Sequence, residues 1–264
     1  MRPSAILAAA AGLALTLGAA GVRAQDVIES GRPDFVESST VVGKGRFQLE
    51  AGLQYERERG GAGRERILST PAVLRFGVAD TVELRVETEG RMNRHLRADG
   101  ERSTDAGYGD TTLALGWHLV DAAAGRPSVG LLASAEFDSG SRAFRGQGVR
   151  PALRVIGEWT LPNGMALGVM PGIGIEREDA GAGRYRYGLF GIVLAKSFGE
   201  RLRGIVEVAL PHIARGKHGG TEASFDIGAA YLLSNDVQLD AMLSRGLNSR
   251  TPDFAFTIGL SIRH

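Results

Sequence analysis

The sequence predicts an all-β protein, a transmembrane antiparallel up-and-down β-barrel of about twelve strands. Apolar and polar residues alternate along most of the chain, as they do in a strand with two different faces. The polar face often carries charged residues, which indicates water on that side. The connections alternate between short and long, which is typical of barrels with short periplasmic turns and longer outer loops. A soluble β-domain is the alternative, because its strands alternate too.

The N-terminus has the features of a secretory signal peptide over residues 1–24. A basic Arg2 precedes an apolar run at 5–20, and the small-residue end at Ala24 is typical of a cleavage site. A single membrane anchor is the alternative, but a run of about sixteen residues is short for a spanning helix. We therefore expect secretion across the inner membrane, cleavage, and delivery to the outer membrane of a Gram-negative cell.

Composition excludes several classes of function. The chain has no Cys, so it can neither form disulfides nor bind a metal through thiolates. Without Arg2 and Arg23, the mature chain keeps 29 basic and 30 acidic residues, which gives no bias towards nucleic acid. The five histidines match no metal-binding spacing, so neither a metal nor another cofactor is expected.

Residues 25–44 have no regular period and are interpreted as an N-terminal extension that precedes a barrel domain at 45–264. Two arrangements remain open for this extension. It either folds into the lumen as a plug, with Arg32, Asp34 and Glu37 against charges of the wall, or lies free in the periplasm.

The barrel strands follow in order. Alternation places them at 47–57, 68–78, 82–89, 111–119, 129–137, 153–159, 165–176, 202–210, 223–231, 237–244 and 256–263. A further strand at 185–196 is apolar on both parities, so its faces are not assigned. The segments have roughly the length that a tilted barrel strand needs to cross a bilayer. The last strand should pair with the strand that begins near Gly45 and close the barrel.

The lengths of the connections and the positions of the aromatic residues distinguish the two ends of the expected barrel. Short connections are expected near 79, 121, 162, 199 and 235, and longer outer loops at 58–66, 90–108, 138–149, 177–184, 212–220 and 245–253. Just before the short turns, where an interfacial girdle is expected, stand Phe76, Trp117, Trp159, Phe198 and Tyr231.

The alternation along the strands places twelve charged residues on the face that should line the lumen. They are Glu50, Glu56, Glu83, Arg85, Glu87, Arg154, Glu158, Arg203, Glu207, Asp226, Asp240 and Arg263. Charges of both signs could set an internal field for a permeating solute. They could equally pair across strands and fill a narrow interior.

Several stretches resemble the MetA-pathway phenol-degradation family of outer-membrane proteins, whose members are often labelled as transporters. They are RPDFVESS at 32–39, GRFQLEAGLQYE at 45–56, TPAVLRFGVADTVELRV at 70–86, and the C-terminal LLSNDVQLDAMLSRGLNSRTPDFAFTIGLSIRH. The resemblance implies an outer-membrane barrel that passes small molecules, aromatic or apolar ones among them, and it carries over no catalytic residue. The chain departs from the usual aromatic C-terminus of such barrels by ending Arg263-His264.

Two interpretations concern partners. Arginines gather in or beside the expected outer loops, namely Arg57, Arg59, Arg64, Arg66, Arg91, Arg94, Arg97, Arg102, Arg142 and Arg145. Arg binds phosphate well, so lipopolysaccharide headgroups are one expected partner of these loops. The same loops contain acidic residues, so a solvated surface of mixed charge is the alternative. The oligomeric state does not follow from the sequence.

The function expected from these features is a porin-like outer-membrane channel or transporter for a small solute. A structural or adhesive barrel without transport is the first alternative. A barrel lipid hydrolase is a weaker one, because His118 faces the expected lumen and no nucleophile motif accompanies it. We therefore expect no enzyme activity.

Overall fold

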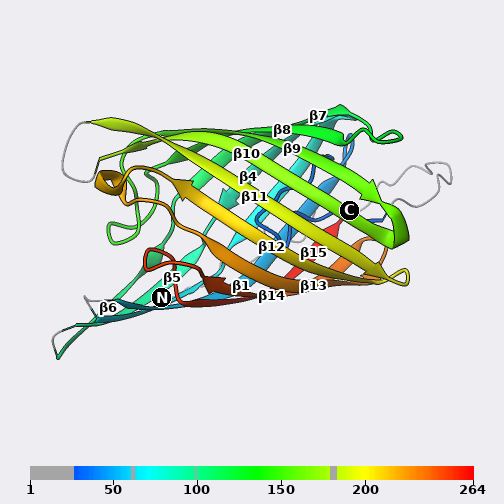
Figure 1. Ribbon diagram of the computed structural model, residues 1–264. Helices are drawn as coiled ribbons and strands as arrows, with labels where there is room; N and C mark the ends of the chain where they lie inside the picture. Colours follow the sequence, from blue (N-terminus) through cyan, green and yellow to red (C-terminus); the bar gives the residue numbers. More distant parts are fainter. Residues whose placement is uncertain (1–26, 61–62, 99, 179–182) are drawn as a thin grey trace, which may run out of the picture.

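The computed structural model describes residues 27–60, 63–98, 100–178 and 183–264, and strands dominate it (Figure 1). The first eight strands are β1 Phe47–Gly60, β2 Gly63–Ser69, β3 Ala72–Ala79, β4 Val82–Thr88, β5 Arg91–Ala98, β6 Glu101–Tyr108, β7 Thr111–Val120 and β8 Ser128–Phe137. The others are β9 Arg150–Leu161, β10 Met165–Arg177, β11 Arg184–Phe198, β12 Leu202–Ile213, β13 Ser224–Ser234, β14 Val237–Gly246 and β15 Phe254–Arg263. Two short 3-10 helices lie in connections, η1 Pro162–Gly164 and η2 Gly216–His218. Within the described ranges, no helix is long and apolar enough to span a bilayer.

The strands form a single closed antiparallel barrel. Around the ring, β1 is followed by β3, β4, β7 and then β8 to β15 in chain order. β2, β5 and β6 do not add to the circumference of the barrel. Each is separated by a short break from a longer wall strand and lies in line with it: β2 with β3, β5 with β4, and β6 with β7. Twelve long strands therefore surround the lumen. The prediction of an all-β up-and-down barrel of about twelve strands is confirmed.

The barrel closes between its first and last strands. β15 pairs with β1 along the seam, from Gln48 opposite Arg263 to Arg57 opposite Phe254. A barrel in lipid must close, because an unpaired strand edge would leave backbone N–H and C=O groups without partners. The expected pairing of the last strand with the strand near Gly45 is therefore confirmed.

The outer face of the wall is apolar, and the inner face is polar along much of the ring. Leu53 on β1, Leu84 on β4 and Ile258 on β15 are 47–51% exposed on the outside. Their strand neighbours point inward and include the buried Glu83. Lipid rather than water suits such a continuous apolar belt, because burying apolar surface is favourable.

Aromatic side chains mark the end of the barrel that has the short turns. Trp117, Phe198 and Tyr231 are exposed there, and the ring of Phe47 stacks on that of Phe76 with 4.4 Å between centroids. In the β9–β10 turn, Asn163 and Gly164 have φ angles of 61° and 69°. Asn and Gly tolerate this left-handed conformation best, which explains the sharp reversal.

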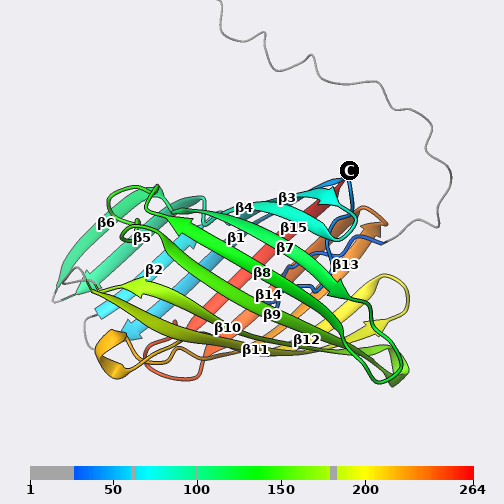
Figure 2. The same cartoon turned by 90° about the horizontal axis from the view of Figure 1, so that it is seen from above.

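The prediction of long loops at 58–66 and 90–108 is wrong. β1 continues to Gly60 and β2 begins at Gly63, while β5 and β6 form a hairpin. β2 pairs with both β1 and β5, so these strands extend the barrel wall beyond its outer end on one side (Figures 1 and 2). We call residues 55–60 together with β2, β5 and β6 the flap. Arginine and glutamate alternate at 56–59 and 64–66, so a search for apolar periodicity misses these parts of the flap.

Candidate functional site

Residues 27–44 lie inside the barrel, and we call them the plug. In Figures 1 and 2 this blue segment runs within the ring of strands. Ile28, Val36 and Val42 are buried, and the N–H of Ile28 donates to the carbonyl oxygen of Asn235 on the wall at 2.7 Å. The described part of the extension therefore packs against the inner face of the barrel wall.

The plug leaves the lumen beside Gly77. The N–H of Gly45 donates to the carbonyl oxygen of Gly77 at 2.8 Å. A Cβ on Gly77 would lie only 1.6 Å from the carbonyl oxygen of Gly43. Only glycine allows two backbones to approach this closely, so Gly77 fixes where the plug joins the wall.

Each of the three predicted plug residues meets an opposite charge on the wall. The pairs are Arg32 with Asp240 at 3.2 Å, Asp34 with Arg203 at 3.1 Å, and Glu37 with Arg85 at 2.7 Å. The wall partners come from β14 and β12, which flank β13, and from β4 on another side of the ring. Burial raises the pKa of Asp34 to about 6, although Arg203 opposes this shift.

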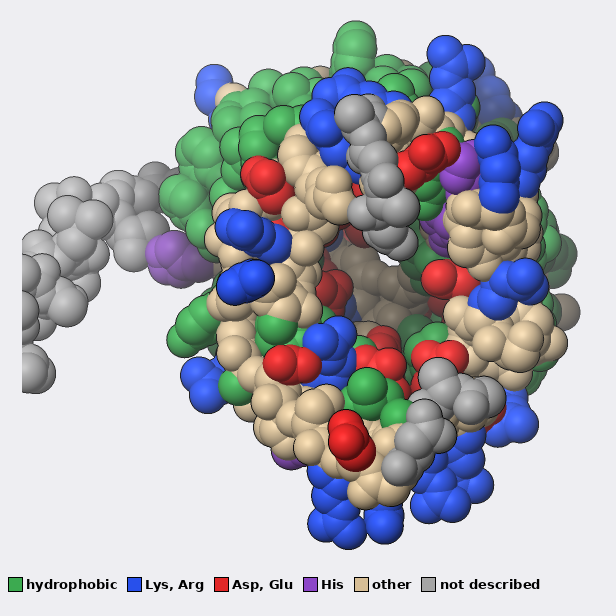
Figure 3. Space-filling view, turned by 90° about the vertical axis from the view of Figure 1, so that its left-hand side faces the viewer, with side chains coloured by type: hydrophobic (Ala, Val, Ile, Leu, Met, Phe, Trp, Pro, Cys, Tyr) green, Lys and Arg blue, Asp and Glu red, His purple; other side chains and the backbone are tan. Residues whose placement is uncertain are grey.

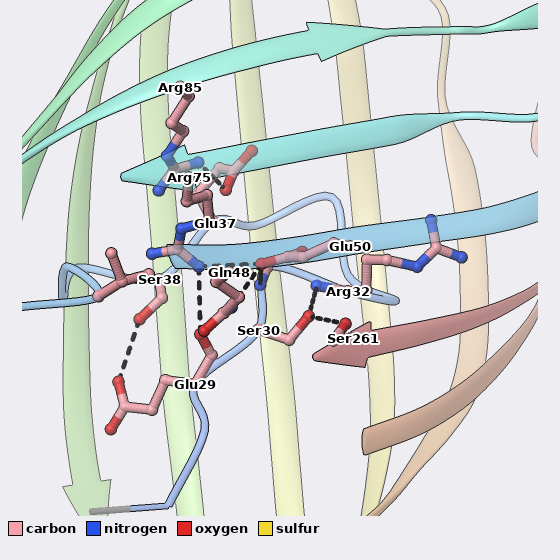
Figure 4. A network of polar contacts seen from close by, with 12 residues as sticks. Glu29, Ser30, Arg32, Glu37, Ser38, Gln48, Glu50, Arg75, Arg85 and Ser261 are labelled. Carbon is pink, nitrogen blue, oxygen red and sulfur yellow. Dashed lines mark hydrogen bonds and ion pairs between the residues drawn. The ribbon is translucent and has the colours of Figure 1, made fainter. Parts of the chain in front are cut away.

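A buried network of charges lies beneath the plug on β1, β3 and β4 (Figure 4). Arg75 donates to Glu50 at 3.0 Å and to both oxygens of Glu83 at 3.0 and 3.1 Å. Glu83 also accepts from Arg85 at 2.6 Å. Arg75 reaches the plug by donating to the carbonyl oxygen of Glu29 at 3.1 Å. Wall and plug are therefore one continuous hydrogen-bonded unit.

Wall carboxylates also bind the backbone of the plug. Glu207 accepts from the N–H groups of Phe35 and Val36, each at 2.8 Å. Glu158 accepts from the N–H of Ser39 at 2.7 Å, and Glu83 accepts from that of Val42 at 2.8 Å. The plug has no helix or strand of its own, so these carboxylates satisfy N–H groups that would otherwise be buried without partners.

The other side of the lumen is apolar, which sequence reasoning missed. The segment at 185–196, whose faces were left unassigned, is part of β11, and it buries Leu189, Val193 and Ala195 on the inner face. With apolar residues of neighbouring strands, these side chains form one cluster that includes Val36 of the plug and contacts Phe35. β11 is apolar on both sides because one face meets lipid and the other meets the plug.

The remaining lumen candidates also lie on the inner face, and one of them, Arg263, reaches the plug by donating to the carbonyl oxygen of Val27 at 3.3 Å. Glu56 accepts from Gln54 at 2.6 Å, and Asp226 accepts from Ser224 at 3.0 Å. Three of their buried atoms have no hydrogen-bond partner: Glu87 Oε1, Arg154 Nε and Asp226 Oδ1. At the short-turn rim, Arg263 donates to Asp236 at 2.7 Å.

A cavity of about 900 Å³ lies between the plug and the short-turn end. Its lining combines plug residues such as Val27 with Glu158 and Arg203 of the wall and with Asp80 and Asp121 of the turns. Seen from the opposite end, the barrel is hollowed, and acidic side chains lie around the opening (Figure 3). The plug therefore stands between two open ends of one lumen.

The family of the chain follows from comparison with known proteins. A family model described as "Putative MetA-pathway of phenol degradation" matches residues 30–264, which include most of the plug and the whole barrel. The chain belongs to this family. No curated protein sequence is significantly similar to the chain.

Solved structures similar to this member of the MetA-pathway family are outer-membrane barrels. An outer membrane channel from Pseudomonas putida F1 has a TM-score of 0.64 at 13% identity, covering 89% of this chain and 100% of that one. The KdgM porin has a TM-score of 0.52 at 12% identity, covering 81% and 98%. The translocator domain of the autotransporter NalP from Neisseria meningitidis has a TM-score of 0.53 at 13% identity, covering 84% and 89%. At these identities the comparisons establish the fold of an outer-membrane barrel.

His118, the candidate catalytic base of this MetA-pathway protein, is not paired with a serine hydroxyl. His118 contacts the carbonyl oxygen of Ser39 at 3.0 Å and Asp121 at 2.9 Å. The hydroxyl of Ser39 instead donates to Glu158. His118 is therefore not placed to activate that serine as a nucleophile. Across the described part of the chain, no group of three or more His, Cys, Asp or Glu side chains could hold a metal ion.

Some residues that hold the plug were not among the sequence candidates. Arg75 is the centre of the buried network, Gln48 donates to the carbonyl oxygen of Glu29 at 2.9 Å, and Gln238 donates to that of Arg32 at 3.2 Å. All three have inward parity, so parity could have found them. A selection of charged residues leaves out the two uncharged glutamines, whereas Arg75 meets that criterion as well.

Proposed function

We propose that the protein is an outer-membrane channel that passes a small solute through a lumen gated by its own plug. The observation that carries this proposal is an ion-paired plug across a closed barrel, with a cavity of about 900 Å³ on one side. A purely structural barrel has no need of such a space. Membership of the MetA-pathway family and the likeness to the Pseudomonas putida channel support the same function.

The solute class we propose is small and partly apolar, with aromatic molecules as the leading candidates. The support is the division of the inner wall into a charged side and an apolar side. A molecule with a flat apolar body and one polar group could contact both sides at once. No cofactor takes part in this proposal.

The lumen candidates then have two roles. Seven of them hold the plug in place, and this role is supported by their contacts with the plug and with one another. They are Glu50, Glu83, Arg85, Glu158, Arg203, Glu207 and Asp240. Glu87, Arg154 and Asp226 keep unpartnered buried atoms, so we propose them as contacts for the permeating solute. Glu56 lies on the same inner face and is proposed to act with them.

The setting of this channel is proposed from the chain as a whole. Residues 1–24, expected to be a cleaved signal peptide, lie outside the described residues. Residues 25–44 would then be the mature N-terminus and include the plug, and 45–264 the barrel domain. Outer-membrane lipid would surround the apolar belt. A second proposed lipid contact is lipopolysaccharide, whose phosphate groups suit the arginine-rich outer segments.

Liposome swelling tests the proposed function. The full mature chain and a variant lacking residues 27–42 are reconstituted in parallel and tested with sugars, amino acids and aromatic acids. We expect swelling with at least one solute and a faster rate for the variant without the plug. If neither protein causes swelling, the structural alternative replaces the channel. Release of fatty acid by the purified protein would instead support the lipid hydrolase.

A further inference from the structure

The flap separates its charges by face. Side chains directly opposite one another on paired strands point to the same side of a sheet. Tyr55 lies opposite Phe256, which belongs to the exposed apolar belt, so the parity of Tyr55 is the outward one. Pairing carries this parity across the flap from β1 through β2 and β5 to β6. Each flap residue can therefore be assigned to the outward or the inward face.

The outward face of the flap is cationic. It carries His95 and seven arginines: Arg57, Arg59, Arg64, Arg66, Arg91, Arg97 and Arg102. The acidic residues of the described flap have the opposite parity and point inward: Glu56, Glu58, Glu65, Glu101 and Asp105. There Asp105 pairs with Arg94 at 2.8 Å, so inward charges are partly compensated within the flap. A surface of randomly mixed charge does not describe this arrangement.

The arginines of the outward face stand directly opposite one another. Arg59 faces Arg64, Arg64 faces Arg97, and Arg97 faces Arg102, in one row across four strands. One step nearer the membrane, Arg57 faces Arg66. Like charges directly opposite across a sheet are destabilising, so a bound anion would stabilise both rows. The row also borders a depression of about 410 Å³ lined by Arg64, Arg66, His95, Arg97 and Arg102.

The height of the cationic face matches the headgroup layer. On β1, the exposed apolar Leu53 is followed on the same face by Tyr55, then by Arg57 and Arg59. From Leu53 to Arg59 is about 20 Å along a strand that rises about 3.3 Å per residue, and tilt reduces the height. In Figure 3, Lys and Arg side chains gather outside the lower rim, the side on which the flap projects in Figure 1. Arginine therefore begins just where the apolar belt ends.

We propose that the outward face of the flap is a docking surface for the phosphate groups of lipopolysaccharide. Arg59, Arg64, Arg97 and Arg102 would bind phosphate through charge-assisted hydrogen bonds, and Arg57 and Arg66 would contact groups nearer the acyl chains. The inference rests on the proposed outer-membrane setting and does not depend on transport. The binding face and its residues follow from the strand pairing. They are not evident from the sequence, in which basic and acidic residues are mixed.

A binding experiment with the full mature chain tests this inference. Four flap arginines are replaced in one variant, R59Q/R64Q/R97Q/R102Q. The matched control R184Q/R215Q/K217Q/R250Q removes four exposed charges at the same end of the barrel but outside the flap. Folding of each variant is checked by heat-modifiable gel migration. Binding to phosphorylated and dephosphorylated lipopolysaccharide is then measured in detergent, with inorganic phosphate as competitor.

We expect the flap variant to bind phosphorylated lipopolysaccharide at least about tenfold more weakly than the wild type, because it loses four of the seven arginines of the cationic face. The control should change affinity far less, and wild-type protein should prefer the phosphorylated form.

Equal binding by flap variant and wild type, or an equal loss in the control, overturns the proposal. Displacement by millimolar inorganic phosphate would also overturn it by indicating a free-anion site. If the flap variant does not fold, a lack of preference of wild-type protein for phosphorylated lipopolysaccharide overturns it alone. Solute swelling is recorded separately, so failure of the channel remains distinguishable.

Discussion

Single carboxylates in the lumen serve several partners at once. Glu83 is fully buried, accepts from Arg75 and Arg85, and also accepts from the N–H of Val42 in the plug. A buried ion pair contributes little net stability when complete, but the loss of one member leaves the other charge uncompensated. The cost of a substitution here therefore reflects the partners that are left behind.

Replacing Glu83 by Gln should lower the free energy of unfolding by about 3 kcal/mol or more, because two buried guanidinium groups lose a shared counter-charge. Urea unfolding in detergent, followed by tryptophan fluorescence, measures the difference. The control is Glu200→Gln, in the exposed β11–β12 turn. Equal stabilities of the two variants would mean that the network does not support the barrel.

The position of the plug should depend on pH through Asp34. Its folded pKa of about 6 lies above its ordinary value of 3.8, because burial outweighs the attraction of Arg203. A group with a raised folded pKa contributes most to docking at low pH, and this contribution is lost as pH rises through the folded value. The undocked plug has the ordinary pKa and the docked plug the raised one, so swelling should become faster as the pH rises from about 4 to about 6. Asp34→Asn should abolish this step, and a variant that keeps the same step would assign it to another group.

At the scale of elements, the plug is an irregular segment stabilised by the barrel around it. Its backbone donors bind wall carboxylates, and its apolar residues pack on β11 and neighbouring strands. Most of these contacts are polar and could be exchanged for contacts with water. Such a segment is better suited to move as a gate than a strand of the wall, whose backbone is bound on both sides.

A disulfide between plug and wall should close the channel. The hydroxyl oxygens of Ser30 and Ser261 are 2.8 Å apart, and the chain has no Cys of its own. The double variant S30C/S261C can therefore form only one intramolecular disulfide. We expect little swelling when it is oxidised and wild-type swelling after reduction, so each sample is its own control. Equal rates in both states would show that solute passes without movement of this part of the plug.

For the molecule as a whole, opposite environments lie on the two sides of one thin wall. Neighbouring residues of a strand differ completely in what they contact, as with Ile258 in the outer belt and Thr257 beside Gln54 in the lumen. This arrangement is stable only when lipid covers the outside and the ring is closed.

An arginine should be tolerated very differently at these two neighbouring positions. Ile258→Arg places a charge in lipid near the middle of β15 and should cost about 2–4 kcal/mol of folding free energy in vesicles. Thr257→Arg points the same group into the polar lumen and should cost much less. Folding titrations in lipid vesicles compare the two variants. A reversed order would mean that the faces of β15 are assigned wrongly.

Local pattern was enough to predict the barrel, because lipid and water impose a period of two on every strand. The closing pair of strands and the inward parity of residues such as Glu83 and Asp240 follow from that period. The three plug candidates Arg32, Asp34 and Glu37 could be named because charged residues in a short extension need partners if the segment is buried. The partners themselves could not be named, since they come from strands far apart in the sequence.

The fold class, the order of the twelve wall strands and the inner and outer faces of most strands follow from local sequence, because they depend on residues adjacent in the chain. How segments distant in sequence meet depends on long-range packing. It brought the plug onto an apolar wall at β11, made Arg75 the centre of a buried network, and turned two expected loops into the flap. It also sorted the flap charges by face, because strand pairing, which no single stretch of sequence specifies, decides which arginines stand side by side.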